Sequence, residues 1–187
     1  MNRSYRLFPL ALILLLGFLT FFLDQVTQVD VTEKKLDPNK PEYTIHNLTA
    51  TRFDTAGNIQ ERLTASQMWQ YPESEERYFM KPVAHIYENG VLQYWVDAER
   101  GQFDRKKQLA YFSDQVTLHT PATQKRPPIR VQTSKMLVQT DKQIASSNQR
   151  VNYEYGLSHG TAVGFKYDRK AQQLYLLSQI KATYVKQ

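Results

Sequence analysis

The chain has 187 residues, enough for about one domain at the usual size of roughly 150 residues. Hydrophobic residues make up 41% and charged residues 22%, which is typical of a folded globular protein and argues against a disordered one. The net charge of +6 is too small and too dispersed for a nucleic-acid-binding surface, but it is compatible with an anionic partner. The lack of cysteine excludes a disulfide framework, a thiolate metal site and a cysteine nucleophile.

An uncharged apolar segment near the N-terminus predicts a membrane anchor. Residues 7–23 contain no charge, follow Arg3 and Arg6, and precede Asp24. A helix of this length rises about 25 Å, which is just enough to cross a bilayer. The positive-inside rule places residues 1–6 in the cytoplasm and the chain after the segment outside it. No small-residue cleavage site follows, so we expect an uncleaved single span and not a secretory signal peptide.

After a polar linker, expected over residues 24–41, the sequence reads as β structure. Residues 42–187 show no long stretch of helical periodicity, but they contain many short runs of Val, Ile, Tyr, Phe, Thr and Trp between turn residues. Asn89-Gly90 is the strongest two-residue hairpin signal. Residues 54–58 form a similar turn between two further strands. We therefore predict an all-β domain.

Three segments with a shared layout predict internal repeats. Residues 98–120, 133–155 and 161–184 each contain a strand ending at an Asp, a short second strand and a third strand, and residues 64–87 form a looser copy. Such β-meander units are too small to bury their own faces and must stack. We expect two packed antiparallel sheets in an open β-jelly roll. The aspartates at the turns, Asp104, Asp141 and Asp168, are expected to cap backbone amides. The last strand of each unit is expected to open at an apolar residue: Val83, Val116, Val151 or Ile180.

The sequence shows no catalytic or metal-binding motif. The four histidines, at positions 46, 85, 119 and 159, lie in different units without metal-ligand spacing. There is no G-x-S-x-G motif, and Asp97 and Glu99 are explained by alternation along a solvated strand face. We therefore expect no enzymatic activity, no metal and no cofactor.

The high aromatic content favours an interior that shelters an amphiphile. Alternation along the strands predicts inward-facing side chains at Phe79, Ile86, Trp95, Val116, Leu118, Leu174 and Tyr184. A sandwich open along one side would expose an apolar trough with basic residues at its rim, which suits a lipid with anionic headgroups. An open sheet also leaves edge strands free to pair with another β protein, and the candidates are the first strand, Tyr43–Phe53, and the last, Ile180–Lys186.

Short motifs in a fixed order give the chain a resemblance to a known family. After the anchor and linker they are Pro41-Glu42-Tyr43, Phe53-Asp54, Leu63-Thr64-Ala65, Phe79-Met80-Lys81-Pro82-Val83, Trp95-Val96-Asp97-Ala98, Asp114-Gln115-Val116, Tyr155-Gly156 and Lys181-Ala182-Thr183-Tyr184. In this order and spacing the sequence resembles the LptC family, bitopic inner-membrane components of lipopolysaccharide export in Gram-negative bacteria.

The resemblance implies a periplasmic open β-jelly roll that takes lipopolysaccharide from an inner-membrane ABC transporter (LptB, LptF and LptG) and passes it to LptA. It implies that Leu48, Phe79, Leu174 and Tyr184 face the lipid. It assigns Tyr43, Ile45 and Phe53 to the edge that docks on the transporter, and Ile180, Ala182 and Tyr184 to the edge that pairs with LptA. Gly156 matches a family glycine at a turn where a bulkier residue would disrupt assembly.

Two other functions remain open on the sequence. A structural scaffold of the cell envelope would have a tightly filled sandwich that binds no lipid. An envelope hydrolase would need a convergent polar cluster, which the sequence does not reveal. The Pro-rich loop at residues 120–129 departs from the family pattern, as does the short stretch after Tyr184.

Overall fold

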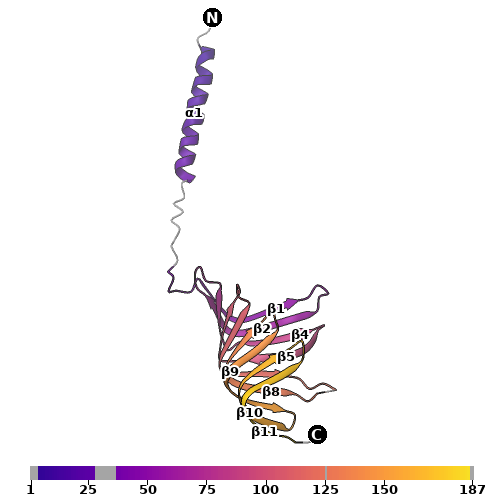
Figure 1. Cartoon of the computed structure of the whole chain (residues 1–187). Coiled ribbons are helices and arrows are strands. Elements are labelled where there is room, and N and C mark those ends of the chain that lie inside the picture. The colour runs from indigo at the N-terminus through magenta and orange to yellow at the C-terminus, as the bar shows by residue number, and fades with distance from the viewer. Residues whose placement is uncertain (1–3, 28–36, 125, 186–187) are drawn as a thin grey trace. The chain divides into compact units, whose positions relative to one another are not determined.

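The computed structural model describes residues 4–27, 37–124 and 126–185 (Figure 1). The chain divides into two compact units, Met1–Lys35 and Leu36–Gln187. Residues 1–3 of the predicted cytoplasmic segment, residues 28–36 of the predicted linker and Lys186 of the predicted docking edge lie outside the described part.

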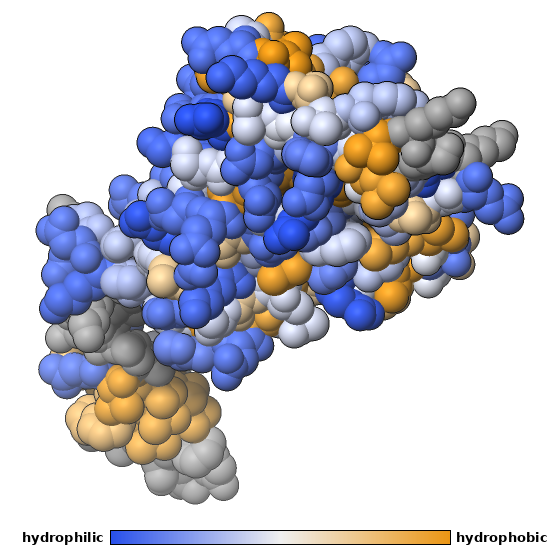
Figure 2. All heavy atoms as spheres, turned by 90° about the horizontal axis from the view of Figure 1, so that it is seen from below, coloured by the Kyte–Doolittle hydropathy of each residue, from blue (hydrophilic) through white to orange (hydrophobic). Residues whose placement is uncertain are grey.

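The first unit contains one helix, α1 (Ser4–Thr27). Its side chains are described for residues 12–26, and all of them are exposed. Figure 2 shows the helix covered by hydrophobic side chains, whereas the surface of the β unit is mostly hydrophilic with smaller hydrophobic patches. Within the described residues, no helix combines the length and apolar character that a membrane crossing requires. The span over residues 7–23 therefore stays a prediction.

The second unit is built entirely from strands, as the sequence predicts. They are β1 (Tyr43–Phe53), β2 (Ile59–Gln70), β3 (Glu76–Met80), β4 (Val83–Glu88), β5 (Val91–Asp97), β6 (Arg100–Asp104), β7 (Leu109–Thr120), β8 (Ile129–Gln139), β9 (Ile144–Tyr155), β10 (Ser158–Asp168) and β11 (Gln173–Thr183). The turns at residues 54–58 and at Asn89-Gly90 are confirmed. At the second turn both residues have positive φ, 51° and 75°, as a tight hairpin of this type requires.

The strands form one continuous 11-stranded antiparallel sheet and not two separate sheets. Two routes connect β2 to β7: one passes through β4 and β5, and the other through β3 and β6. From β7 onward each long strand pairs with the next, and β1 pairs with β2. In the described chain the sheet therefore has two edges, β1 and β11, which lie at opposite ends of the stack in Figure 1.

A row of β-bulges folds this sheet into two facing halves. The register shifts between Ser113 and Val116 in β7–β8, and again at the neighbouring pairs β8–β9, β9–β10 and β10–β11. Positive φ angles mark the same line, at Asp114, Gln115, Gly164 and Gln179. Because an extra residue bends a strand and increases its twist, a column of bulges folds the sheet along one line, here called the fold line.

The fold line corrects the predicted repeat unit. The second and third strands expected in residues 98–120, 133–155 and 161–184 are one bent strand in each unit: β7, β9 and β11. Two of the three predicted aspartate caps are confirmed: Asp104 accepts a hydrogen bond from the Lys107 amide at 2.9 Å, and Asp168 accepts one from the Ala171 amide at 3.1 Å. Within the described residues, Asp141 makes no bond of this kind.

The hydrophobic core lies between the two halves in two clusters. The large cluster joins residues from both sides of the fold line, such as Phe112 and Val138 on one side and Leu118 and Val131 on the other. The small cluster consists of Ala65, Met68 and Phe79, with Leu48, Leu63 and Phe103 packed against it. The interior is therefore filled in the middle of the sheet and sparse near β1.

Candidate functional site

Most of the residues predicted to line the interior lie between the halves. Val116 and Leu118 are each 1% exposed within the large cluster, and Ile86 and Leu174 pack against that cluster. Phe79 is buried in the small cluster with Leu48 against it. The structure thus separates these side chains into two groups, one near β1 and one extending to β11.

Trp95 is the exception, because it lies on the opposite face of β5 from the buried Tyr94 and Val96. Its ring stacks on His119 from β7, with centroids 4.6 Å apart, and on His85 from β4, with centroids 6.2 Å apart. The interior position predicted for Trp95 from alternation is therefore wrong.

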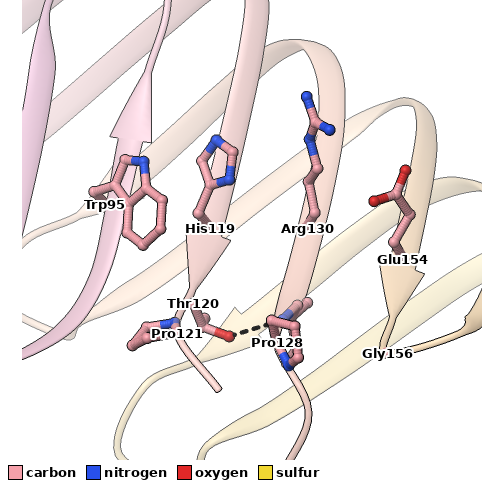
Figure 3. Close-up of a pocket in the computed structure, with 9 residues that line it drawn as sticks. Trp95, His119, Thr120, Pro121, Pro128, Arg130, Glu154 and Gly156 are labelled. Carbon is pink, nitrogen blue, oxygen red and sulfur yellow. Dashed lines mark hydrogen bonds between the residues drawn. The ribbon is translucent and has the colours of Figure 1, made fainter.

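A shallow pocket of about 270 Å³ is lined in part by Trp95 and His119 of this stack. Figure 3 shows Trp95, His119, Arg130 and Glu154 projecting side by side from neighbouring strands. His119 Nε2 lies 3.0 Å from Asp97 Oδ1. Trp95 is thus stacked between histidines of the two neighbouring strands, His85 of β4 and His119 of β7.

The inner cavity lies between the two halves of the sheet beside β11. Its volume is about 380 Å³. Leu174 and Leu176 come from one side of the fold line, and Ala182 and Tyr184 from the other. Its other lining residues are Arg126, Ile129, Tyr153, Tyr155, Ser158, Gln172 and Thr183. The structure thus brings together three of the predicted residues, Leu174, Ala182 and Tyr184, at the last strand.

The C-terminal side of this cavity is held in place by Ser158. Its hydroxyl accepts a hydrogen bond from the Val185 amide at 3.0 Å. Tyr184, which precedes Val185, is 81% exposed at the cavity rim. An exposed aromatic ring beside an apolar cavity can contact either a ligand in the cavity or a strand added to β11.

The two edge strands carry the remaining predicted residues on accessible surface. Tyr43, Ile45 and Phe53 on β1 are 37%, 39% and 58% exposed, and Ile180 on β11 is 53% exposed. Gly156 lies in the turn between β9 and β10, where its φ of 59° strains any larger residue, and its amide donates to the Pro128 carbonyl at 3.1 Å. Exposed apolar side chains on unpaired edges favour strand addition by a partner.

Among the polar side chains of the inner cavity that the sequence did not indicate are those of Arg126, Tyr153 and Ser158. Tyr153 lies in β9 and Ser158 in β10, two paired strands for which alternation had indicated no inward-facing residue. Arg126 lies in the Pro-rich loop that departs from the family pattern. That departure was the signal in the sequence that could have drawn attention to it.

Comparison with known proteins places this arrangement in a family. The fold resembles the crystal structure of LptH from Pseudomonas aeruginosa, the LptA-homologous periplasmic component of the lipopolysaccharide transport device, with a TM-score of 0.55 and 6% identity, covering 67% of this chain and 95% of that one. No curated protein sequence matches the chain significantly. The family model described as "Lipopolysaccharide-assembly, LptC-related" matches residues 9–185. The chain therefore belongs to the LptC-related family of lipopolysaccharide assembly.

Proposed function

We propose that this protein carries lipopolysaccharide from an inner-membrane ABC transporter, formed by LptB, LptF and LptG, to the periplasmic protein LptA. The observation that carries the proposal is the apolar cavity between the two halves of the sheet at its last edge strand. Membership of the family and the similarity to an LptA homologue support it. The protein acts by binding and transfer and not as an enzyme.

The cavity addresses the main energetic barrier of lipid transport. Exposing acyl chains to water costs about 0.8 kcal/mol per CH₂ group, or roughly 10 kcal/mol for a chain of about 14 carbons. Leu174, Leu176 and Ile129 offer such a chain an apolar wall. Ile86, Val116 and Leu118 continue this wall toward the centre, and Leu48 and Phe79 toward β1. Because the centre is filled, passage of a lipid requires the two halves to separate.

The two edges give the transfer a direction. In the proposal β1 docks on the transporter through Tyr43, Ile45 and Phe53, and β11 pairs with LptA through Ile180, Ala182 and Tyr184. The segment 7–23 anchors the protein in the inner membrane, with the β unit in the periplasm. Docking at both edges would extend the folded sheet from one protein into the next.

A second candidate function is an envelope scaffold that binds no lipid. The close packing of the centre favours it, because Val96, Val116, Leu118, Val131, Val151 and Phe165 are at most 2% exposed. The cavity at β11 favours the transfer function. The two candidates differ in whether lipopolysaccharide enters the interior.

Photo-crosslinking in living cells separates these candidates. A benzophenone amino acid replaces an inward-facing aromatic residue, Phe79 or Tyr153, and the outward-facing Tyr111 as the matched control. The readout is an adduct that reacts with antibody to lipopolysaccharide. The transfer function predicts adducts at Phe79 and Tyr153 and none at Tyr111. Absence of an adduct at both inner positions, with folded protein and an active transporter, would favour the scaffold.

A further inference from the structure

The loop between β7 and β8 holds one arginine at the inner cavity. Thr123 and Arg126 form an isolated β-bridge, in which the Thr123 amide donates to the Arg126 carbonyl at 2.8 Å and the Arg126 amide donates to the Thr123 carbonyl at 3.3 Å. At the base of the loop, the Ile129 amide donates to Thr120 Oγ1 at 3.1 Å. Pro127 and Pro128 further restrict the backbone. The loop therefore places Arg126 by its own hydrogen bonds.

Arg126 is the one charged side chain among the described residues that line this cavity. It is half-buried, and within the described part of the chain no carboxylate lies within ion-pair distance of it. Its positive charge also acts on Tyr167 in the core. Burial raises the pKa of Tyr167, and the positive charges of Arg126 and Arg169 partly oppose that rise. A half-buried cation next to apolar surface is costly unless an anion neutralises it.

Arg169, the other arginine whose charge acts on Tyr167, differs from Arg126 because it has a carboxylate partner. Its guanidinium Nη2 lies 3.1 Å from Glu88 Oε2, and its side chain is 14% exposed. Arg126 has no corresponding partner in the described chain. The geometry thus leaves one guanidinium available for an anion that comes from outside the protein.

From this arrangement we infer that Arg126 binds the phosphate group of an anionic amphiphile whose acyl chain lies against Leu174, Leu176 and Ile129. A guanidinium forms two parallel hydrogen bonds with a phosphate group, which an ammonium cannot do. Tyr153 lines the same cavity, and its hydroxyl supplies a further donor. The inference rests on the proposed function and deepens it, because it names the residue that selects for an anionic headgroup.

Calorimetric titration of the full chain in phosphatidylcholine nanodiscs tests this inference. The probes are decyl phosphate, the neutral decyl maltoside and inorganic phosphate, with empty nanodiscs subtracted. The variants are Arg126→Gln, Arg126→Lys and the matched control Arg130→Gln. Arg130 is exposed, lies in β8 four residues after Arg126, and points to the outer face beside Glu154 (Figure 3).

The expected result is a selective loss in one variant. Arg126→Gln weakens decyl phosphate binding about tenfold and leaves decyl maltoside binding unchanged, since one charged hydrogen-bonding group is lost. Arg126→Lys retains part of the affinity for decyl phosphate, and Arg130→Gln retains all of it. Inorganic phosphate binds the wild type far more weakly than decyl phosphate, because the acyl chain contributes most of the affinity.

Three outcomes would overturn the inference. Equal binding of decyl phosphate by the wild type and Arg126→Gln would show that Arg126 does not contact the headgroup. An equal loss for both amphiphiles would mean that Arg126 only shapes the cavity, and tight binding of inorganic phosphate would mean that the site takes a free anion. Failure of the wild type to bind either amphiphile would instead contradict the proposed function itself.

Discussion

Trp95 and His119 stack in register across β5 and β7, with ring centroids 4.6 Å apart and planes inclined by 4°. The stack lies on the outer face of the sheet. The Nε2 atom of His119 also lies 3.0 Å from Asp97 Oδ1. Because two neighbouring inner-face positions, Val96 and Leu118, are also in register, the same pair of strands carries a polar aromatic outer face and a fully apolar inner face.

Replacing Trp95 by alanine is expected to weaken folding without affecting lipid binding. The change removes the stack with His119 and part of the buried ring surface, which costs about 1–3 kcal/mol of the free energy of unfolding. Urea denaturation of the full chain measures this loss. The lipopolysaccharide adduct from a probe at Phe79 stays unchanged, because Trp95 is outside the interior. Loss of that adduct in a folded Trp95→Ala protein would mean that the lipid contacts the outer face.

His85 makes the stability of the protein depend on pH. Burial lowers the pKa of His85, the positive charge of Arg62 lowers it further, and Asp97 partly opposes the effect. Its Nδ1 atom is buried without a hydrogen-bond partner among the described residues. The unfolded chain binds a proton at His85 near the ordinary pKa of about 6.5, whereas the folded chain resists it. Stability therefore falls as the pH drops below about 6.5.

The His85→Gln variant tests this dependence. We expect its free energy of unfolding to fall less than that of the wild type when the pH is lowered from about 7 to about 5. His159→Gln, at an exposed position, is the matched control for replacing a histidine by glutamine. Identical slopes in His85→Gln and the wild type would show that other groups cause the pH dependence.

Local signals in the sequence predicted much of the fold. The turn at residues 54–58 formed because Asp54 accepts hydrogen bonds from the amides of Ala56 and Asn58, both at 2.9 Å. The hairpin at Asn89-Gly90 formed because both residues tolerate positive φ. These features depend on a few neighbouring residues, which is why they can be recognised without knowledge of the tertiary structure.

Features that depend on distant strands were harder to predict. The outward position of Trp95 was missed because Tyr94 and Trp95 are both large and aromatic, so alternation alone does not indicate which of them faces inward. The fold line was missed because non-glycine residues, Asp114, Gln115 and Gln179, adopt the positive φ of its bulges. Arg126 was missed because its role arises from cavity walls formed largely by β9 to β11, far from it along the chain.

Thr133 tests the importance of the fold line. It is 8% exposed, and its hydroxyl donates to the Arg150 carbonyl at 3.1 Å and lies 3.2 Å from Ser147 Oγ. Thr133→Val removes the hydroxyl that donates to this carbonyl, so we expect a loss of about 1 kcal/mol in the free energy of unfolding, measured by urea denaturation. Thr133→Ser keeps the hydroxyl and should lose clearly less. An equal loss in both variants would assign the effect to packing of the methyl group.

Tyr184→Asp is expected to block docking at β11 while preserving the fold. Tyr184 is 81% exposed at the end of the unpaired edge, so little buried surface is lost when it is replaced. A charged side chain on an edge opposes strand addition, because pairing would remove the charge from water. A pull-down with LptA should recover much less partner with this variant, and the circular dichroism spectrum should match that of the wild type.

Two further variants separate the loss of edge pairing from a general effect of the added charge. Tyr111→Asp places the same charge on an exposed position of the interior strand β7, which has no free edge, so normal recovery of LptA is expected. Tyr184→Phe keeps the ring without the hydroxyl and should also pair normally, since main-chain hydrogen bonds provide most of the affinity in strand addition. Normal LptA recovery by a folded Tyr184→Asp variant would exclude this end of β11 from the interface and leave Tyr184 a role in the cavity alone.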